Sequence, residues 1–224
     1  MSTHAVGAAY DARADDYVEL LGDVALLSPL DRATIAEWGG GIPGAVLDAG
    51  CGPGHWADEL SRTRPPGVRA TFPQPARAVV CVDASRRFVD AARERFPHLD
   101  VRVGDLAALP VGDASVAGVL AWYSVIHTVP DELGAVFAEF ARVLAPGGSV
   151  LLGFVDGEPA APFDHAVAAA WSWRAESLAE RLAPHGLEVT RSSTRHDPGA
   201  RPHGELVAVR PPLRSRAQPS RDQG

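Results

Sequence analysis

Apolar and polar residues along this chain alternate between compact runs and longer, spaced patterns. Short continuous apolar runs, bounded by acidic residues, glycine or proline, predict buried strands. These runs occupy residues 46–49, 78–83, 101–106, 116–126 and 149–154. Between them, apolar residues recur every three or four positions, as in Asp131–Leu144, which predicts amphipathic helices. Strands that alternate with helices in this way favour a parallel sheet with helices on both faces.

Start and stop signals place further helices. We expect one helix over Tyr10–Val24 and another from Ser28-Pro29 to Trp38, where three glycines follow. A third is expected over Ser85–Phe96. Proline and glycine within Ala145–Gly148 are expected to end the helix that precedes the fifth strand.

Two stretches lack a clear pattern, and the chain closes with two more apolar runs. Four prolines interrupt Arg62–Ala78, which we expect to be a mobile surface loop. The runs at 187–190 and 205–209 have no helix between them, so they predict a closing antiparallel hairpin. Residues 211–224 are rich in proline, serine and arginine, which is typical of a disordered tail.

The composition limits the possible classes of protein. The chain has 224 residues, of which 46% are hydrophobic, which suits one domain with a substantial core. Its formal net charge of -7 argues against a nucleic acid as the main partner. The absence of lysine excludes Schiff-base chemistry. No run approaches the roughly 18 apolar residues of a membrane span, and residues 1–9 lack the pattern of a secretory signal.

The two cysteines, Cys51 and Cys81, both fall in apolar strand or turn sequence. We therefore expect reduced thiols and a cytoplasmic protein, and no metal site. Cys51 as a nucleophile is one interpretation. A small buried side chain beside a ligand is the more common role of a free cysteine.

The most informative stretch runs from Val46 to Leu60, where a strand pattern ends in Asp48, glycines follow at alternate positions and a helical pattern begins. Gly50, Gly52 and Gly54 can adopt backbone angles closed to other residues and leave room for a ligand against the main chain. A strand, a tight turn and a helix N-terminus in this order predict a site for a nucleotide-like molecule.

The spacing of the glycines distinguishes between two nucleotide classes. A dinucleotide fingerprint needs a third glycine at position 55, where this chain has His55. The pattern D-x-G-x-G-x-G instead resembles motif I of the class I S-adenosylmethionine (SAM) dependent methyltransferases, which in that family surrounds the methionine end of the cofactor. SAM is cationic and has no phosphate, which suits an acid without a nearby basic residue. The product would be S-adenosylhomocysteine (SAH).

The resemblance extends over roughly residues 10–210 and implies a fold. That fold is a Rossmann-like, doubly wound α/β sheet of seven mostly parallel strands, with an antiparallel last strand, in three α/β/α layers. It also implies a division of the chain. Residues 1–45 would form a helical segment that caps the cofactor site, residues 46–210 the SAM-binding core, and residues 211–224 the tail.

Two further acids follow strands at the places where the family binds its cofactor. Asp83 ends the second strand, and the resemblance implies that it binds the ribose hydroxyls; a helix N-cap is the alternative. Asp105 follows the third strand and would bind the adenine amine, unless it is an ordinary turn residue. The full set implied for the cofactor is Tyr10, Tyr17, Asp48, Gly50, Cys51, Gly52, Gly54, Asp83, Ala84, Ser85, Gly104, Asp105, Leu106, Ala121 and Trp122.

The acceptor side of the site is expected after the fourth strand and beyond the fifth. His127 is a candidate base, because an imidazole has a pKa suited to taking a proton from a hydroxyl or amine. It could equally orient the loop, since methyl transfer often needs only alignment. Tyr123, His165 and Trp173 are the other residues expected to border a compact acceptor. Within Phe163–Leu182 the tryptophans fit a core-packing helix equally well.

The sequence predicts a methyltransferase that acts on a small molecule as a monomer or homodimer, with no nucleic acid or membrane partner. Two other classes remain. A nicotinamide-dependent oxidoreductase would use the same strand, turn and helix, but it lacks its third glycine here. A non-catalytic SAM-binding regulatory or partner protein would have an identical cofactor site, and only the polar, aromatic stretch Trp122–His127 argues against it.

Overall fold

The computed structural model of the chain describes residues 3–14, 17, 27–63 and 77–213. Most of the loop expected at 62–78 therefore lies outside the described residues, as does the tail from residue 214. The second half of the helix expected over Tyr10–Val24 also lies outside them.

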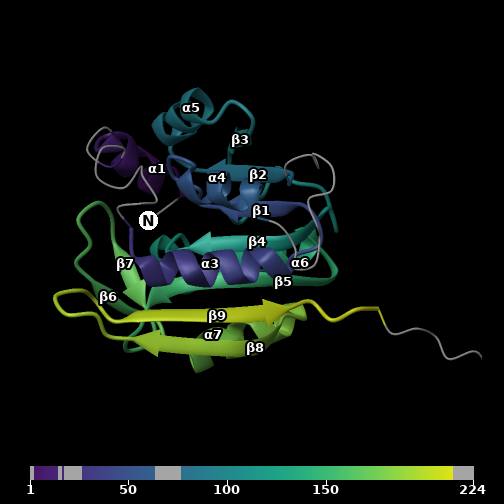
Figure 1. Cartoon of the computed structure of the whole chain (residues 1–224). Coiled ribbons are helices and arrows are strands. Elements are labelled where there is room, and N and C mark those ends of the chain that lie inside the picture. Colours follow the sequence, from purple (N-terminus) through teal and green to yellow (C-terminus); the bar gives the residue numbers. More distant parts are fainter. Residues whose placement is uncertain (1–2, 15–16, 18–26, 64–76, 214–224) are drawn as a thin grey trace, which may run out of the picture.

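One sheet of seven strands runs through the described residues in the order β3-β2-β1-β4-β5-β9-β8 (Figure 1). The strands β1 to β5 pair in parallel, and β9 pairs antiparallel with both β5 and β8. The bounds are β1 Val46–Ala49, β2 Val79–Asp83, β3 Asp100–Val103, β4 Val116–Trp122, β5 Leu144–Val155, β8 Glu188–Arg195 and β9 His203–Val209. The expected Rossmann-like fold with an antiparallel last strand is confirmed.

Helices cover both faces of this sheet. The helices are α1 Thr3–Asp11, α3 Pro29–Gly41, α4 His55–Arg62, α5 Arg86–Arg95, α6 Leu133–Val143 and α7 Ala175–Leu182, with the short 3₁₀ turns η2 Val125–His127 and η3 Ala183–His185. One hydrophobic cluster packs α6 and α7 against the sheet, and a second packs α3, α4 and α5 against its other face. Alternate strand residues serve the two clusters: Leu47 belongs to the first and Val46 to the second.

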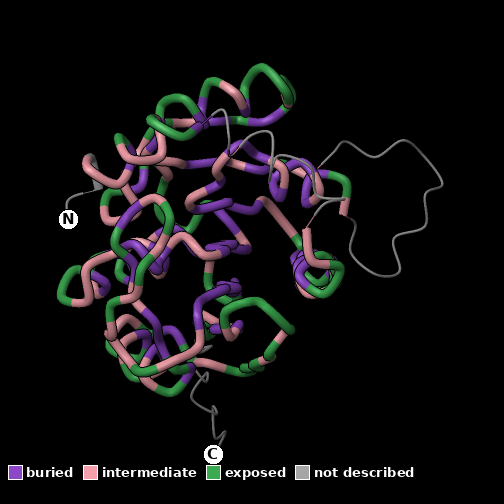
Figure 2. The backbone as a smooth tube through the Cα atoms, turned by 90° about the vertical axis from the view of Figure 1, so that its left-hand side faces the viewer, coloured by how far each residue is buried: buried purple, intermediate pink, exposed green. Residues whose placement is uncertain are grey.

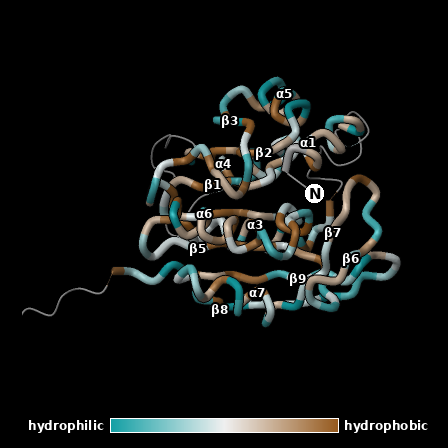
Figure 3. Tube along the Cα trace, turned by 180° about the vertical axis from the view of Figure 1, so that it is seen from behind, coloured by the Kyte–Doolittle hydropathy of each residue, from teal (hydrophilic) through white to brown (hydrophobic). Residues whose placement is uncertain are grey.

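Burial follows this layering. Buried residues and hydrophobic residues both concentrate along the central strands, while the outer surfaces of the helices are exposed and more polar (Figures 2 and 3). The chain order reverses between β1 and β4, which are neighbours in the sheet although β2 and β3 come between them in the sequence. In open α/β sheets such a reversal leaves a crevice at the carboxyl ends of the strands. Among the described residues, no helix is long and apolar enough to cross a membrane.

The structure corrects several expected boundaries. Helix α6 ends at Val143, as the proline and glycines of Ala145–Gly148 predict, but strand β5 already begins at Leu144, and its regular pairing with β4 resumes at Ser149 after a register shift. The fourth strand ends at Trp122, and a 3₁₀ turn takes up the rest of the expected run. Helix α3 continues through its three glycines. At Gly39 a Cβ would come within 2.5 Å of the Leu60 side chain, so glycine there allows α3 to pack closely on α4.

A second correction concerns the region 163–182, where a helix was one interpretation. Its first half is a two-stranded hairpin of β6 Ala161–Phe163 and β7 Ala170–Ser172, and only α7 is helical. Trp173 explains the difference: its side chain is fully buried, and its backbone N–H donates to the Val155 carbonyl at 2.9 Å. Tertiary contacts thus hold this segment extended against the end of β5.

The N-terminal helix also differs from expectation, because α1 begins at Thr3 and ends at Asp11. Its small residues carry little apolar periodicity, but they permit close packing. A Cβ at Gly7 would lie 2.5 Å from the Ala84 carbonyl oxygen. The Asp11 carboxylate accepts hydrogen bonds from the Ser85 hydroxyl at 2.6 Å and from the Arg87 N–H at 3.1 Å. These contacts fix α1 beside the start of α5.

The two serine N-caps offer a matched test of this arrangement. The Ser85 hydroxyl accepts from the Phe88 N–H at 3.1 Å, whereas Ser28, the N-cap of α3, makes no side-chain capping bond. We expect Ser85→Ala to lower the free energy of unfolding by about 1–2 kcal/mol, because it also removes the bond to Asp11. Ser28→Ala should change it by less than about 0.5 kcal/mol. Urea denaturation of both variants checks this, and equal losses would contradict it.

Candidate cofactor and acceptor site

The turn between β1 and α4 shapes the base of the site. Gly50, Gly52 and Gly54 all have positive φ, at 81°, 52° and 86°. A Cβ at Gly50 would lie 2.2 Å from the Ser124 Cβ, so the backbone there passes close against the segment that leaves β4. At Gly52 a Cβ would meet nothing within 4 Å, which leaves the peptide open to the neighbouring cavity. The expected strand, turn and helix are confirmed as local structure.

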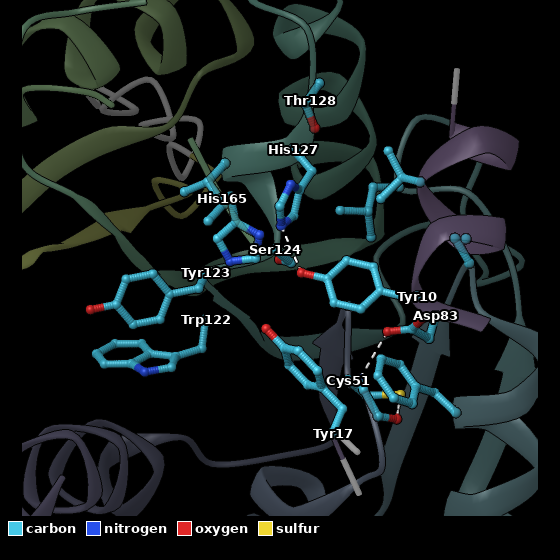
Figure 4. A pocket seen from close by; sticks show the side chains of 18 of the residues that line it. Tyr10, Tyr17, Cys51, Asp83, Trp122, Tyr123, Ser124, His127, Thr128 and His165 are labelled. Carbon is cyan, nitrogen blue, oxygen red and sulfur yellow. Dashed lines mark hydrogen bonds between the residues drawn. The ribbon is translucent and has the colours of Figure 1, made fainter. Parts of the chain in front are cut away.

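A cavity of about 570 Å³ lies at the carboxyl ends of the parallel strands. Helix α1, the turn η2 and the hairpin β6–β7 contribute to its wall (Figure 4). Most residues expected at the site line it together: Tyr10, Tyr17, Gly50, Cys51, Gly52, Asp83, Ala84, Gly104, Asp105, Leu106, Trp122, Tyr123, His127 and His165. The structure thus gathers residues from six separate parts of the chain around one space.

Five residues of the sequence prediction are not on this wall. They are Asp48, Gly54, Ser85, Ala121 and Trp173. Asp48 lies beneath the glycine turn, Ser85 caps α5 and Gly54 precedes α4 as its N-cap. Ala121 and Trp173 are fully buried in the cluster under α6 and α7. Trp173 therefore does not border an acceptor; its ring lies 5.0 Å from the Arg181 guanidinium.

Asp83, at the end of β2, is an ordered acid of the cavity. One carboxylate oxygen accepts from the Gly52 N–H and the other from the Ser85 N–H, both at 2.8 Å. Burial raises the pKa of Asp83 to about 6, in spite of these bonds. Each carboxylate oxygen keeps a lone pair for a further donor. Two hydroxyl groups of one ligand could bind there side by side.

The third strand ends in a similarly ordered acid. The Asp105 carboxylate accepts from the Ala107 N–H at 2.9 Å, and the Gly104 N–H donates to the Asp83 carbonyl at 2.9 Å. A Cβ at Gly104 would lie 2.8 Å from the Val82 side chain, so glycine is required for this close approach. Asp105 therefore makes a turn bond and faces the cavity as well.

Trp122 and Tyr123 are held by polar side chains from other elements of the fold. The Trp122 indole N–H donates to Asp31 at 3.1 Å, and Asp31 also pairs with Arg195. Tyr123 has a φ of 56°, which is strained for a tyrosine. Its hydroxyl bonds to His203, whose other nitrogen lies 3.3 Å from Glu205. In Figure 4 this hydroxyl points away from Tyr10 and His127, so the phenol anchors the wall.

His127 has both ring nitrogens engaged. Nδ1 lies 2.9 Å from the Ala169 carbonyl oxygen, and a carbonyl only accepts, so Nδ1 carries the hydrogen. Nε2 is then the acceptor of the Tyr10 hydroxyl at 2.7 Å. Burial lowers the pKa of His127 to about 4, with the Ala169 hydrogen bond opposing this shift and His165 adding to it. The imidazole is thus neutral near pH 7.

His165 lies beside His127, with the ring centroids 4.8 Å apart in an edge-to-face arrangement. Its Nδ1 accepts from the Val167 N–H at 3.3 Å, so its Nε2 carries the hydrogen. Burial lowers its pKa as well. The ring centroids of His165 and Phe163 are 6.3 Å apart. The Arg201 guanidinium lies 4.6 Å from the Phe163 ring centroid.

The charges of the cavity suit a cationic ligand without phosphate. Asp83 and Asp105 line it, and Asp48 lies below with one carboxylate oxygen that has no hydrogen-bond partner. Burial raises the pKa of Asp48 to about 8, with a further contribution from the charge of Asp83. Among the described residues, Arg201 is the arginine on the wall. The open peptide at Gly52 and the carboxylates of Asp83 and Asp105 on the wall therefore fit SAM better than a dinucleotide.

The surroundings of Cys51 argue against a nucleophilic role. A hydrogen bond with Cys81 raises the pKa of the Cys51 thiol, and burial raises it as well. Both effects disfavour the nucleophilic thiolate. Both cysteines are buried and free. The part of the chain that the structure describes contains no group of three or more His, Cys, Asp or Glu side chains able to hold a metal ion.

Sequence reasoning missed several wall residues, including Val6, Gly7, Asp31, Phe88, Ser124 and Arg201. Ser124 could have been found, because it follows two residues that were expected there. Asp31 and Arg201 could not, since each comes from an element whose position against the site depends on tertiary packing.

Comparisons with known proteins agree with this geometry. Residues 46–148 match the family model described as "Methyltransferase domain". A probable S-adenosylmethionine-dependent methyltransferase of Mycolicibacterium smegmatis is 38% identical over 107 residues, which cover 48% of this chain and 36% of that protein. The malonyl-[acyl-carrier protein] O-methyltransferase of Yersinia pestis is 33% identical over 106 residues, 47% of this chain and 34% of that protein. The chain thus matches about a third of the length of these relatives.

Solved structures share the fold across nearly the whole chain. The [4+2]-cyclase SpnF has a TM-score of 0.73 and 20% identity, with 95% of this chain and 98% of that chain covered. The 1,6-didemethyltoxoflavin-N1-methyltransferase of Burkholderia thailandensis, solved with 1,6-didemethyltoxoflavin and S-adenosylhomocysteine, has a TM-score of 0.67 and 19% identity over 94% of this chain and 91% of that one.

The buried acid beneath the turn gives a pH-dependent prediction. Between its ordinary pKa of 3.8 and its folded pKa of about 8, Asp48 holds a proton that the unfolded chain releases. Stability should therefore fall as the pH rises through this window. We expect Asp48→Asn to raise the free energy of unfolding of the ligand-free protein by about 2 kcal/mol at mildly alkaline pH, and little at pH 4.

Chemical denaturation across this pH range measures the effect. Asp90→Asn is the matched control, because Asp90 is an exposed aspartate with only an ion pair to Arg93. A pH-independent difference between Asp48→Asn and the wild type would contradict the prediction.

Proposed function

From the premise that this chain contains a class I SAM-dependent methyltransferase domain, we propose that the protein transfers the methyl group of SAM to a compact small-molecule acceptor. The observation that carries the proposal is Asp83, which lines the cavity and whose two carboxylate oxygens are held by the Gly52 and Ser85 N–H groups. This is the arrangement needed to bind a ribose through two hydroxyls.

The other residues that line the cavity suggest where the remaining parts of SAM would bind. The peptides of Gly50, Cys51 and Gly52 would meet the methionine part, with Tyr17 and Trp122 beside it. Asp105 and the Leu106 backbone would meet the adenine. Asp48, protonated in the ligand-free protein near pH 7, would lie below the methionine part, where the positive charge of SAM would favour its ionisation. Residues 1–45 would cap this site, since α1 lies over Ala84 and Ser85.

The remaining wall supports a compact acceptor with aromatic or hydrogen-bonding character. Tyr10, His127, His165, Phe163 and Tyr123 all line the cavity, and in Figure 4 Tyr10 lies between Asp83 and His127. The toxoflavin N-methyltransferase, which shares the fold, binds a small heterocycle in its solved structure. The cavity of about 570 Å³ has to hold cofactor and acceptor together, which favours a small acceptor.

The chemistry asks little of the protein beyond placement. SAM supplies an already activated methyl group, so the wall has to align the acceptor in line with it and exclude water. His127 and His165 are the candidates for catalysis, whereas the Tyr123 hydroxyl is engaged with His203 and serves to hold the wall. A non-catalytic SAM-binding protein would have no need for the buried His127–His165 pair.

The buried free thiols Cys51 and Cys81 support a cytoplasmic setting, and we propose a monomer or homodimer without a nucleic-acid partner.

Isothermal titration with SAH, NAD and NADP tests the cofactor. We expect SAH to bind in the micromolar range and neither dinucleotide to bind. Asp83→Asn should weaken SAH binding by about 10–100-fold, because it removes hydrogen bonds to a charged acceptor. Asp90→Asn, an exposed change on the same helix that Ser85 caps, should leave the affinity within about twofold.

NAD binding, or SAH binding that Asp83→Asn leaves intact, would refute the proposed site. Thermal unfolding of Asp83→Asn without ligand shows whether the turn itself survives the substitution. Conversion of SAM to SAH in the presence of a small acceptor would separate a transferase from a passive binder.

A further inference from the structure

Tyr10 stands between His127 and the space where an acceptor would lie. The Tyr10 hydroxyl donates to His127 Nε2 at 2.7 Å, and His127 Nδ1–H donates to the Ala169 carbonyl at 2.9 Å. His127 is 7% exposed and its one basic nitrogen is covered by this hydroxyl. Because the one lone pair of Nε2 is taken by the Tyr10 hydroxyl, a ligand in the cavity can exchange a proton with this nitrogen through the Tyr10 oxygen (Figure 4).

On the basis of this geometry, and resting on the proposed function, we propose that Tyr10 and His127 form a proton relay for hydroxyl acceptors. Tyr10 is the catalytic residue that touches the acceptor, and His127 is the positioning residue that stores the proton behind it. The acceptor class that needs such a relay is a compact phenol, enol or alcohol. A neutral amine can attack through its lone pair before it loses a proton.

The relay balances in protons and charge. As the acceptor O–H bond breaks, its proton passes to the Tyr10 oxygen, and the original Tyr10 proton passes to His127 Nε2. The acceptor oxygen forms its bond to the methyl carbon, and the donor sulfur keeps the electron pair of the broken bond. The sulfonium loses one positive charge while the imidazole gains one, so the net charge of the cavity does not change.

The surroundings of His127 explain why its protonation would coincide with methyl transfer. Tyr10, His165 and the Ala169 carbonyl are the polar groups in contact with its ring, and no carboxylate pairs with it among the described residues. Burial lowers its pKa to about 4, which disfavours an imidazolium even without a ligand, and the charge of a bound sulfonium would add a repulsion. Loss of that charge removes the repulsion.

Two features set Tyr10 apart from a purely packing tyrosine. Its ring lies edge-to-face with Tyr17 at 5.4 Å and with His127 at 5.4 Å, so its orientation is fixed from both sides. Helix α1, which carries it, is held to α5 through Asp11. The hydroxyl is thus presented to the cavity by a fixed element.

Nitrogen-15 NMR of histidine-labelled protein tests the relay without turnover. We expect His127 to be the Nδ1–H tautomer with a hydrogen-bonded Nε2, and Tyr10→Phe to shift the Nε2 resonance alone. The pKa of His127 should be higher in the SAH complex than in the SAM complex by on the order of one unit, because only SAM carries the sulfonium charge. Equal pKa values in the two complexes would overturn the relay.

Methyl transfer to simple probes gives the second readout. At mildly alkaline pH, phenol is largely protonated and 4-nitrophenol is largely ionised, so only phenol needs the relay. We expect Tyr10→Phe and His127→Asn to lower turnover of phenol by about 100-fold or more, and that of 4-nitrophenol by less than about threefold. His127→Asn keeps an N–H donor for Ala169, which protects the local fold.

Equal losses for the two phenols would show a structural role and overturn the relay. Methylation of aniline but of neither phenol would contradict the proposal that the acceptor carries a hydroxyl group. Failure to bind SAH would instead refute the proposed function, whereas SAH binding without the expected difference in the pKa of His127 refutes the relay alone.

Discussion

One buried carboxylate holds the site together. Asp83 accepts hydrogen bonds from the glycine turn through Gly52 and from the start of α5 through Ser85, and its own carbonyl accepts from Gly104. Three strand ends are thus tied to a single residue. Because burial raises its pKa to about 6, this carboxylate is costly to leave without donors, and a ligand with two hydroxyls would satisfy it.

The same connection extends to the N-terminal helix. Ser85, which donates its N–H to Asp83, donates its hydroxyl to Asp11 at the end of α1. Helix α1 in turn places Tyr10 against His127, which follows β4. A short series of hydrogen bonds therefore connects Asp83 with His127 by way of α1.

The opposite wall is fixed by a separate set of buried polar groups. Trp122 is held by Asp31 and Tyr123 by His203, and these partners come from α3 and from β9. The strained backbone of Tyr123 is maintained by these contacts, and it places Ser124 against Gly50. Strain of this kind persists where the surrounding structure enforces it. Buried contacts from distant elements thereby hold this wall of the cavity in place.

By itself, the sequence determined the local elements and the cofactor. The glycine turn, Asp83 and the alternation of apolar runs with helical patterns depend on backbone geometry and burial, which short stretches encode. Only the tertiary structure decided the hairpin at Ala161–Ser172, the cavity positions of Asp31 and Arg201, and the pairing of Tyr10 with His127, 117 residues away. These depend on contacts between distant segments, and local pattern carries no information about which side chains such contacts bring together.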